Sequence, residues 1–94
     1  MIVNRRTFVP KRGYLGEAAE LLKQASHKGA FPVTARMYVP DIAPFDVLAV
    51  ELEFKDWDQY HKYWAEWSPG EAFWKKWYAI TENGGTNEVW RLLD

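Results

Sequence analysis

The order in which hydrophobic periodicity changes along this 94-residue chain constrains its fold more than any other sequence feature. Alternation of apolar and polar residues indicates a half-buried strand, whereas recurrence every three to four residues indicates a helix. On this basis strands are predicted at 2–9, 33–39, 45–55 and 87–93, and helical segments at 14–28, 56–67 and 68–80. The two adjacent helical segments count as one broken helix, so the predicted order is β-α-β-β-α-β.

Local signals mark the ends of the predicted helices. Gly29 follows a basic last turn and suits a left-handed C-terminal cap. Asp56 and Gln59 form a D-x-x-Q opening that is typical of a capping box. Ser68 is expected to cap the next helical segment, with proline at its first position. The run 83–85, Asn-Gly-Gly, is expected to separate this segment from the last strand.

The β-α-β-β-α-β order predicts a single ferredoxin-like α+β domain, with the helices on one face of an antiparallel sheet. The other face then lacks a cover. On the third predicted strand that face carries Val47 and Ala49 beside Glu51 and Glu53. A mixed face of this kind can be closed by a second copy of itself, so we expect a homodimer.

Aromatic residues are unusually frequent, with six Trp, five Tyr and five Phe. A domain of this size cannot bury sixteen large rings, so some must meet a partner subunit or a ligand. Trp57, Tyr60 and Trp64 share one predicted helix face. This stripe is consistent either with a core face or with one wall of a pocket for a flat ligand.

Several classes of protein are disfavoured by composition. The chain has no cysteine, and its two histidines, His27 and His61, do not form a metal-binding pair, so neither a disulfide framework nor a metal site is expected. A cytoplasmic protein without membrane segments is expected, because no signal peptide or long apolar run is seen.

Charge is distributed unevenly although the net charge is only −1. Residues 1–36 carry seven Lys or Arg against two acids, and residues 37–94 carry five against eleven. A nucleic-acid-binding domain usually has an overall basic excess, which is lacking here. We therefore expect basic and acidic residues to pair across the sheet, and no nucleic-acid partner.

His61 is the one candidate general base, because histidine titrates near neutral pH. It shares a predicted helix face with Tyr60 and Trp64, so it can equally be a packed residue. No neighbouring residue in the sequence supplies the partner that a base requires.

Three arginines, Arg5, Arg6 and Arg36, lie on the first two predicted strands. They could bind a carboxylate or phosphate of a ligand, or they could pair with Glu51 and Glu53. Arg36 also shares a strand face with Tyr38, which makes these two residues a candidate polar corner of a binding site.

Three stretches carry a family resemblance: N-R-R-T-F-V-P-K-R-G (4–13), L-A-V-E-L-E-F-K-D-W (48–57) and E-V-W-R-L-L (88–93). They resemble the first strand, the third strand and the last strand of NIPSNAP-like proteins in the dimeric α/β-barrel superfamily. The resemblance implies a ferredoxin-like protomer, two of which pack sheet to sheet into a barrel. Members of that superfamily include cofactor-free monooxygenases, haem-degrading monooxygenases, isomerases and proteins of unknown role, so the fold does not fix the function.

The haem-degrading branch pairs a strand asparagine with a tryptophan and an axial histidine. Asn4 and Trp64 match the first two positions, but residues 73–77 are Phe-Trp-Lys-Lys-Trp where the histidine would fall. Haem needs an axial ligand, so no cofactor is expected.

The sequence therefore favours a protein that binds a small apolar or aromatic molecule, in a pocket either between helices and sheet or inside the barrel. An alternative is a cofactor-free monooxygenase or isomerase, and another is a purely structural interaction module. The candidate catalytic residues are His61 and Asn4. The candidate ligand-binding residues are Arg36, Tyr38, Tyr60 and Trp64.

Overall fold

A computed structural model describes residues 1–26, 28–29, 31–42 and 45–93. The elements are β1 (Ile2–Pro10), α1 (Leu15–Ala25), β2 (Thr34–Tyr38), β3 (Leu48–Phe54), α2 (Trp57–Glu66), α3 (Glu71–Ile80) and β4 (Thr81–Arg91). The strands form one antiparallel sheet in the order β2-β3-β1-β4. This order and connectivity confirm the predicted ferredoxin-like α+β fold.

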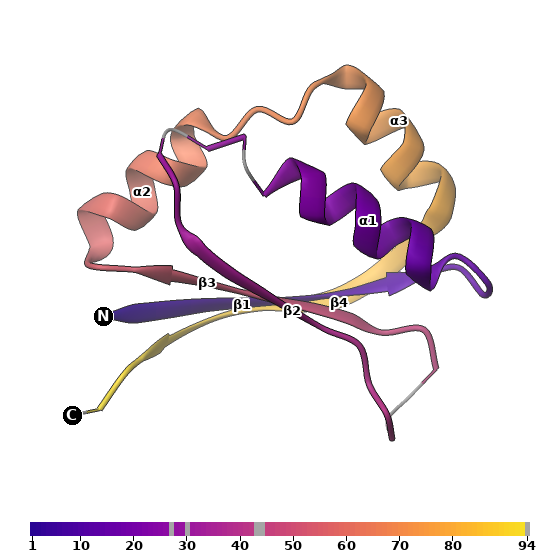
Figure 1. Ribbon diagram of the computed structural model, residues 1–94, viewed down its shortest axis with the longest axis horizontal. Coiled ribbons are helices and arrows are strands. Elements are labelled where there is room, and N and C mark those ends of the chain that lie inside the picture. The colour runs from indigo at the N-terminus through magenta and orange to yellow at the C-terminus, as the bar shows by residue number, and fades with distance from the viewer. Residues whose placement is uncertain (27, 30, 43–44, 94) are drawn as a thin grey trace.

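The helices α1, α2 and α3 lie together on one side of the sheet, and no described helix covers the opposite side (Figure 1). The covered face is apolar because alternate residues of β3 point toward the helices: Leu48, Val50, Leu52 and Phe54 are all buried. They belong to one core cluster that also includes Ala18 of α1. None of the helices in the described ranges is long and apolar enough to cross a membrane.

The C-terminal end of α1 differs from the prediction. The helix ends at Ala25, and Gly29 does not adopt the left-handed conformation expected of a glycine cap. A Cβ atom at Gly29 would overlap the ring of Tyr63. Glycine is therefore needed here because α2 approaches the backbone closely, and not because the helix needs a left-handed cap. His27, which was expected in the last turn, lies outside the described residues.

The predicted cap of α2 by Asp56 is confirmed, but the reciprocal bond of the capping box goes to the residue before Asp56. The Asp56 carboxylate accepts a hydrogen bond of 2.9 Å from the Gln59 backbone N–H, and the Gln59 side chain accepts one of 2.7 Å from the Lys55 N–H. The first bond satisfies a backbone donor that a helix start leaves free, and the second fixes the chain just before the helix.

The predicted start of α3 is wrong by two residues. The residue that precedes the helix is Gly70, with φ 95°, and not Ser68. The Ser68 backbone N–H instead donates to the Lys28 carbonyl over 3.2 Å, which ties the α2–α3 connection to the segment after α1. This long-range contact replaces the local cap that the sequence favours.

The last strand starts earlier than predicted. β4 begins at Thr81, directly after α3, and runs through Gly84 and Gly85. Both glycines have positive φ, 120° and 96°, and the pairing of β1 with β4 shifts register between Thr7 and Val9. The Asn-Gly-Gly run thus forms a β-bulge inside the strand, where a break was predicted.

Candidate functional site

A cavity of about 80 Å³ lies between the helices and the covered face of the sheet, and it opens to solvent. Its lining is mostly aromatic and aliphatic. Arg6 of β1 is the only charged side chain among the described residues that line it. The other lining residues are Phe8, Leu22, Ser26, Val50, Leu52, Tyr63, Trp64, Trp67, Phe73, Trp74 and Trp77. A few polar groups in an apolar surround are typical of small-molecule sites.

Asn4 of β1 lies at the centre of a hydrogen-bond network beside this cavity. Its side chain is fully buried, and its amide nitrogen donates to the Asn87 side chain (2.7 Å) and to the Glu88 carbonyl (2.9 Å). Its amide oxygen accepts from Arg6 Nε (3.1 Å) and from Trp64 Nε1 (3.2 Å). All the strong hydrogen-bonding positions of the amide are therefore used by the protein itself.

Arg6 is partly buried and its guanidinium lies over the Trp64 ring, 3.8 Å from the centroid. Burial lowers the pKa of this guanidinium from its ordinary value, and the hydroxyls of Tyr60 and Tyr63 partly offset the effect. Arginine keeps its proton in proteins, so the cavity holds a permanent positive charge.

Residue Tyr63 is the most deeply buried large residue of α2. Its hydroxyl donates to the Ser26 carbonyl over 2.8 Å, and burial raises its pKa. Trp67 makes a similar contact, donating through Nε1 to the Ala25 carbonyl over 2.8 Å. These two bonds anchor the aromatic wall of the cavity to the end of α1.

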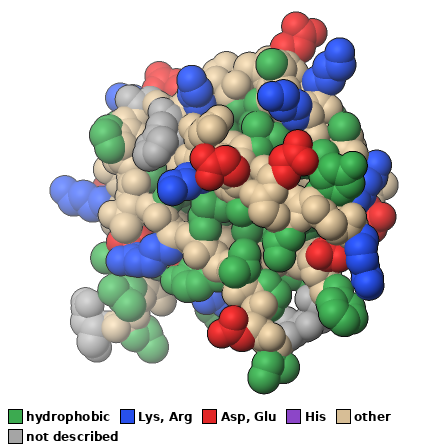
Figure 2. All heavy atoms as spheres, turned by 45° about the vertical axis from the view of Figure 1, so that its right-hand side comes forward, with side chains coloured by type: hydrophobic (Ala, Val, Ile, Leu, Met, Phe, Trp, Pro, Cys, Tyr) green, Lys and Arg blue, Asp and Glu red, His purple; other side chains and the backbone are tan. Residues whose placement is uncertain are grey.

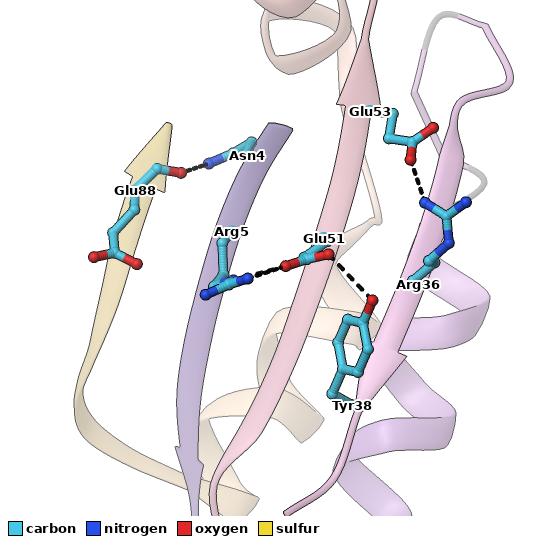
Figure 3. Close-up of polar contacts among 7 residues, drawn as sticks. All are labelled: Asn4, Arg5, Arg36, Tyr38, Glu51, Glu53 and Glu88. Atoms are coloured by element: carbon cyan, nitrogen blue, oxygen red, sulfur yellow. Dashed lines mark hydrogen bonds and ion pairs between the residues drawn. The ribbon is translucent and has the colours of Figure 1, made fainter. Parts of the chain in front are cut away.

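The uncovered sheet face has a different character, shown in Figure 3. Arg5 forms an ion pair with Glu51, and Arg36 forms one with Glu53. The Tyr38 hydroxyl donates to Glu51 over 3.1 Å. The hydrogen bond from Arg5 holds the pKa of the Glu51 carboxyl below its ordinary value.

These pairs confirm that the basic first part of the chain meets the acidic second part. A third pair, Arg12 with Asp46 at 3.5 Å, joins the two parts at a turn.

The structure places the predicted site residues in three separate regions: beside the cavity, on the uncovered sheet face, and, for His61, on the exposed side of α2. Asn4 and Trp64 are hydrogen-bonded to each other beside the cavity, and Tyr60 lies close to Arg6 without lining the cavity. Arg36 and Tyr38 lie on the uncovered sheet face, on the opposite side of the sheet from Asn4.

His61 is on the exposed side of α2, stacked on Trp57 with ring centroids 5.9 Å apart. It does not line the cavity.

Sequence reasoning missed Tyr63 and Trp67 of the cavity wall because the inward face of α2 was placed part of a turn away, through Trp57. The inward stripe is Tyr60, Tyr63, Trp64 and Trp67, whereas Trp57 is 48% exposed. Spacing of i, i+3, i+4 and i+7 along 60–67 is the signal that identifies this stripe.

The rings of this wall form a continuous chain. Trp64 contacts Trp67 edge to face at 5.3 Å, and Trp67 contacts both Phe73 and Trp74 at 5.8 and 5.7 Å. Trp77 is stacked on Phe73 and contacts Phe8 of β1. Figure 2 shows hydrophobic side chains reaching the surface between charged ones over the middle of one face.

The described residues contain no group of three or more His, Asp or Glu side chains placed to hold a metal ion. The site offers binding through one guanidinium and an aromatic surface.

Comparison of the sequence with known family profiles and with functionally curated proteins gives no match. Several solved structures do share the fold. An uncharacterised NIPSNAP-domain protein from Burkholderia xenovorans superposes with a TM-score of 0.79 at 12% identity, covering 99% of this chain and 95% of its own. A NIPSNAP-family protein from Agrobacterium tumefaciens gives 0.79 at 16% identity, covering 99% and 86%.

A third structure is an antibiotic biosynthesis monooxygenase, with a TM-score of 0.74 at 12% identity over the full length of both chains. Identities this low carry the fold and leave the function open. The chain thus has the ferredoxin-like fold of NIPSNAP-domain proteins and of a monooxygenase, built around an aromatic cavity with one arginine.

Proposed function

We propose that this protein binds a small, flat, largely apolar or aromatic molecule in the cavity between the helices and the sheet. The observation that carries the proposal is the lining itself, in which four tryptophans surround a space that opens to solvent. Tryptophan rings provide a large contact surface at little cost in side-chain entropy, and flat ligands pack well against them.

The cavity is smaller than the engineered cavity of roughly 150 Å³ that holds benzene in another protein. A ligand larger than about 80 Å³ inserts one end into the cavity and leaves its other end at the opening to solvent. This geometry favours elongated or monocyclic molecules over large polycyclic ones.

Intrinsic tryptophan fluorescence tests the proposal directly. Titration with benzyl alcohol, indole, benzoate and indole-3-acetate is expected to quench or shift the emission saturably for at least one of them. Trp64→Phe should weaken binding of that compound, because this indole lines the cavity. Trp90→Phe is the matched control, because Trp90 lies opposite Val3 on the uncovered sheet face.

An unchanged spectrum with every compound, in the native protein, would contradict ligand binding and favour the purely structural role. Loss of binding in both tryptophan variants would show that the effect is not specific to the cavity.

We also propose that the working form is a homodimer, closed through the uncovered sheet face. Trp90 and Tyr38 are 56% and 47% exposed at the two edges of this face, and the ion pairs of Arg5 and Arg36 lie between them. Internal pairing of these charges lowers the cost of burying them against a second copy. Each protomer then keeps its own cavity, because the helices lie on the other side of the sheet.

Light scattering measures the oligomeric state directly. The native protein is expected at twice the 11.1 kDa of the chain. Trp90→Glu should shift it toward the monomer, whereas Trp57→Glu should not, since Trp57 is similarly exposed but lies on α2. A native protein that runs as a monomer would contradict the dimer, and with it the barrel. A cytoplasmic location stays a prediction.

The catalytic alternative, a cofactor-free monooxygenase or isomerase, stays a prediction. Its candidate residues His61 and Asn4 differ in position: His61 is exposed, and Asn4 is buried beside the cavity. Oxygen uptake with a dihydroxyaromatic substrate, abolished by His61→Ala, would support it. No uptake with the native protein would count against it.

A further inference from the structure

The three arginines of β1 and β2 have different electrostatic partners. Arg5 pairs with Glu51 and Arg36 pairs with Glu53, both on the uncovered sheet face. Arg6 points to the other face, and in the described part of the chain no carboxylate lies within ion-pair distance of it. Among these three arginines, the one without an acidic partner is thus the one that lines the cavity.

The position of Arg6 is fixed from two directions. Its Nε donates to Asn4, and the face of its guanidinium lies against the Trp64 ring. Asn4 is held in turn by Asn87 and by the Glu88 carbonyl. A guanidinium held in this way loses little side-chain freedom when its remaining N–H groups bind a ligand.

Burial makes an unpaired charge costly, and a bound anion removes that cost. The lining around Arg6 supplies no competing carboxylate and is otherwise apolar apart from Ser26 and the tyrosine and indole edges. Phe8 and Trp77 lie edge to face at 5.1 Å within the same wall, and they give an apolar surface for the body of the ligand.

We propose that the ligand is an aromatic or apolar monocarboxylate, and that Arg6 binds its carboxylate group. This proposal rests on the proposed function and names the ligand class for the same cavity. Asn4 and Trp64 are positioning residues in it, because both bind Arg6 and the Asn4 amide has no hydrogen-bonding position left for a ligand.

A carboxylate fits this site better than a phosphate. The planar guanidinium matches the two oxygens of a carboxylate, and one positive charge balances one negative charge. A phosphate carries close to two negative charges, and the described lining provides no second cation for it.

The test uses matched pairs in which an amide replaces the acid: benzoate with benzamide, and indole-3-acetate with indole-3-acetamide. Calorimetric titration of the native protein is expected to show at least about tenfold tighter binding of the acid in one pair, as a charge-assisted hydrogen bond implies. Arg6→Met should remove this preference while the amide still binds. Arg5→Met is the control, since Arg5 is the neighbouring residue on the opposite sheet face and should leave the preference unchanged.

Equal binding of acid and amide by the native protein would overturn the assignment of Arg6 and leave the proposed function standing. An acid preference that survives in Arg6→Met would also overturn it. Absence of binding by all four compounds, when benzyl alcohol or indole still binds, would overturn this inference alone. Absence of binding by every one of these compounds would overturn the proposed function as well.

A second measurement does not depend on the folding of a variant. In the native protein the NMR signal of the Arg6 Nε–H group should shift on addition of the acid, and shift much less with the amide. Movement of the Arg5 signal in its place would contradict the proposal.

Discussion

At the scale of single residues, the contact between Gly29 and Tyr63 shows how the helices are held together. The Tyr63 ring is fully buried, its hydroxyl is bonded to the Ser26 carbonyl, and it lies edge to face against Phe54 of β3. The ring therefore has no room to move away from a side chain at position 29. Only the lack of a Cβ atom allows the segment after α1 to lie this close to α2.

Gly29→Ala is accordingly expected to lower the free energy of unfolding by about 1–3 kcal/mol, as overpacking of a buried contact does. Gly16→Ala, in the first turn of α1, is the control, because nothing lies within 4 Å of a Cβ atom there. It should raise stability by about 0.5–1 kcal/mol through helix propensity. Urea denaturation measures both, and equal effects in the two variants would contradict a specific clash at Gly29.

Single residues were also where the sequence was least informative. Asn4 and Trp64 were both predicted to belong to a site, and they are hydrogen-bonded to each other. The distinct role of Arg6 was not predicted, since strand parity shows which face a residue occupies but not which acid lies opposite. That information depends on strand register, in which Arg5 lies opposite Glu51 and Arg6 lies opposite Val50.

At the scale of elements, β4 shows how a local turn signal can be overridden. Asn-Gly-Gly is typical of a turn, yet Gly84 and Gly85 continue the strand and produce a bulge against β1. Pairing along the whole of β1 supplies backbone hydrogen bonds that an early turn would lose. The order of the elements was predictable from periodicity, but this boundary was not, because the pairing joins residues far apart in the sequence.

The two glycines of the bulge should respond differently to substitution. A Cβ atom at Gly85 would overlap the Thr7 carbonyl, whereas at Gly84 it would meet only a Val9 methyl group at 3.6 Å. Gly84→Ala should lose about 1–3 kcal/mol of stability from its positive φ alone. Gly85→Ala should lose more, by about a further 1–3 kcal/mol, because backbone must also move.

Thermal and urea denaturation of both variants check this difference. A smaller loss for Gly85→Ala than for Gly84→Ala would contradict the close approach of β4 to β1.

At the scale of the whole molecule, the charged residues of the uncovered sheet face make the free energy of unfolding depend on pH in acid. The Glu51 carboxyl receives hydrogen bonds from Arg5 and Tyr38, and its folded-state pKa lies below its ordinary value of 4.5. A lowered pKa stabilises the fold fully above the unfolded-state pKa. That contribution is lost as the pH falls from about 4.5 through the folded-state value.

The free energy of unfolding is therefore expected to fall below pH 4.5 with a steeper slope in the native protein than in Glu51→Gln. Glu66→Gln, at the exposed end of α2, is the control and should leave the slope unchanged. Urea denaturation between pH 3 and pH 7 provides the measurement, at roughly the range in which carboxylates titrate. An identical slope in native protein and Glu51→Gln would show that this network does not contribute.

The chain of rings along the cavity wall has an optical consequence. Trp64, Trp67 and Trp74 follow one another at 5.3 and 5.7 Å, and Tyr63 is joined to the first of them at 5.0 Å. Chromophores this close exchange excitation energy and couple their electronic transitions. Excitation energy absorbed by one indole is then transferred to the others in the wall. A molecule that quenches the fluorescence of one ring therefore lowers the emission of its neighbours as well. The same coupling means that several rings together should produce the near-ultraviolet circular dichroism bands of this protein. A change in these bands should therefore report that the cavity is occupied, without an added label.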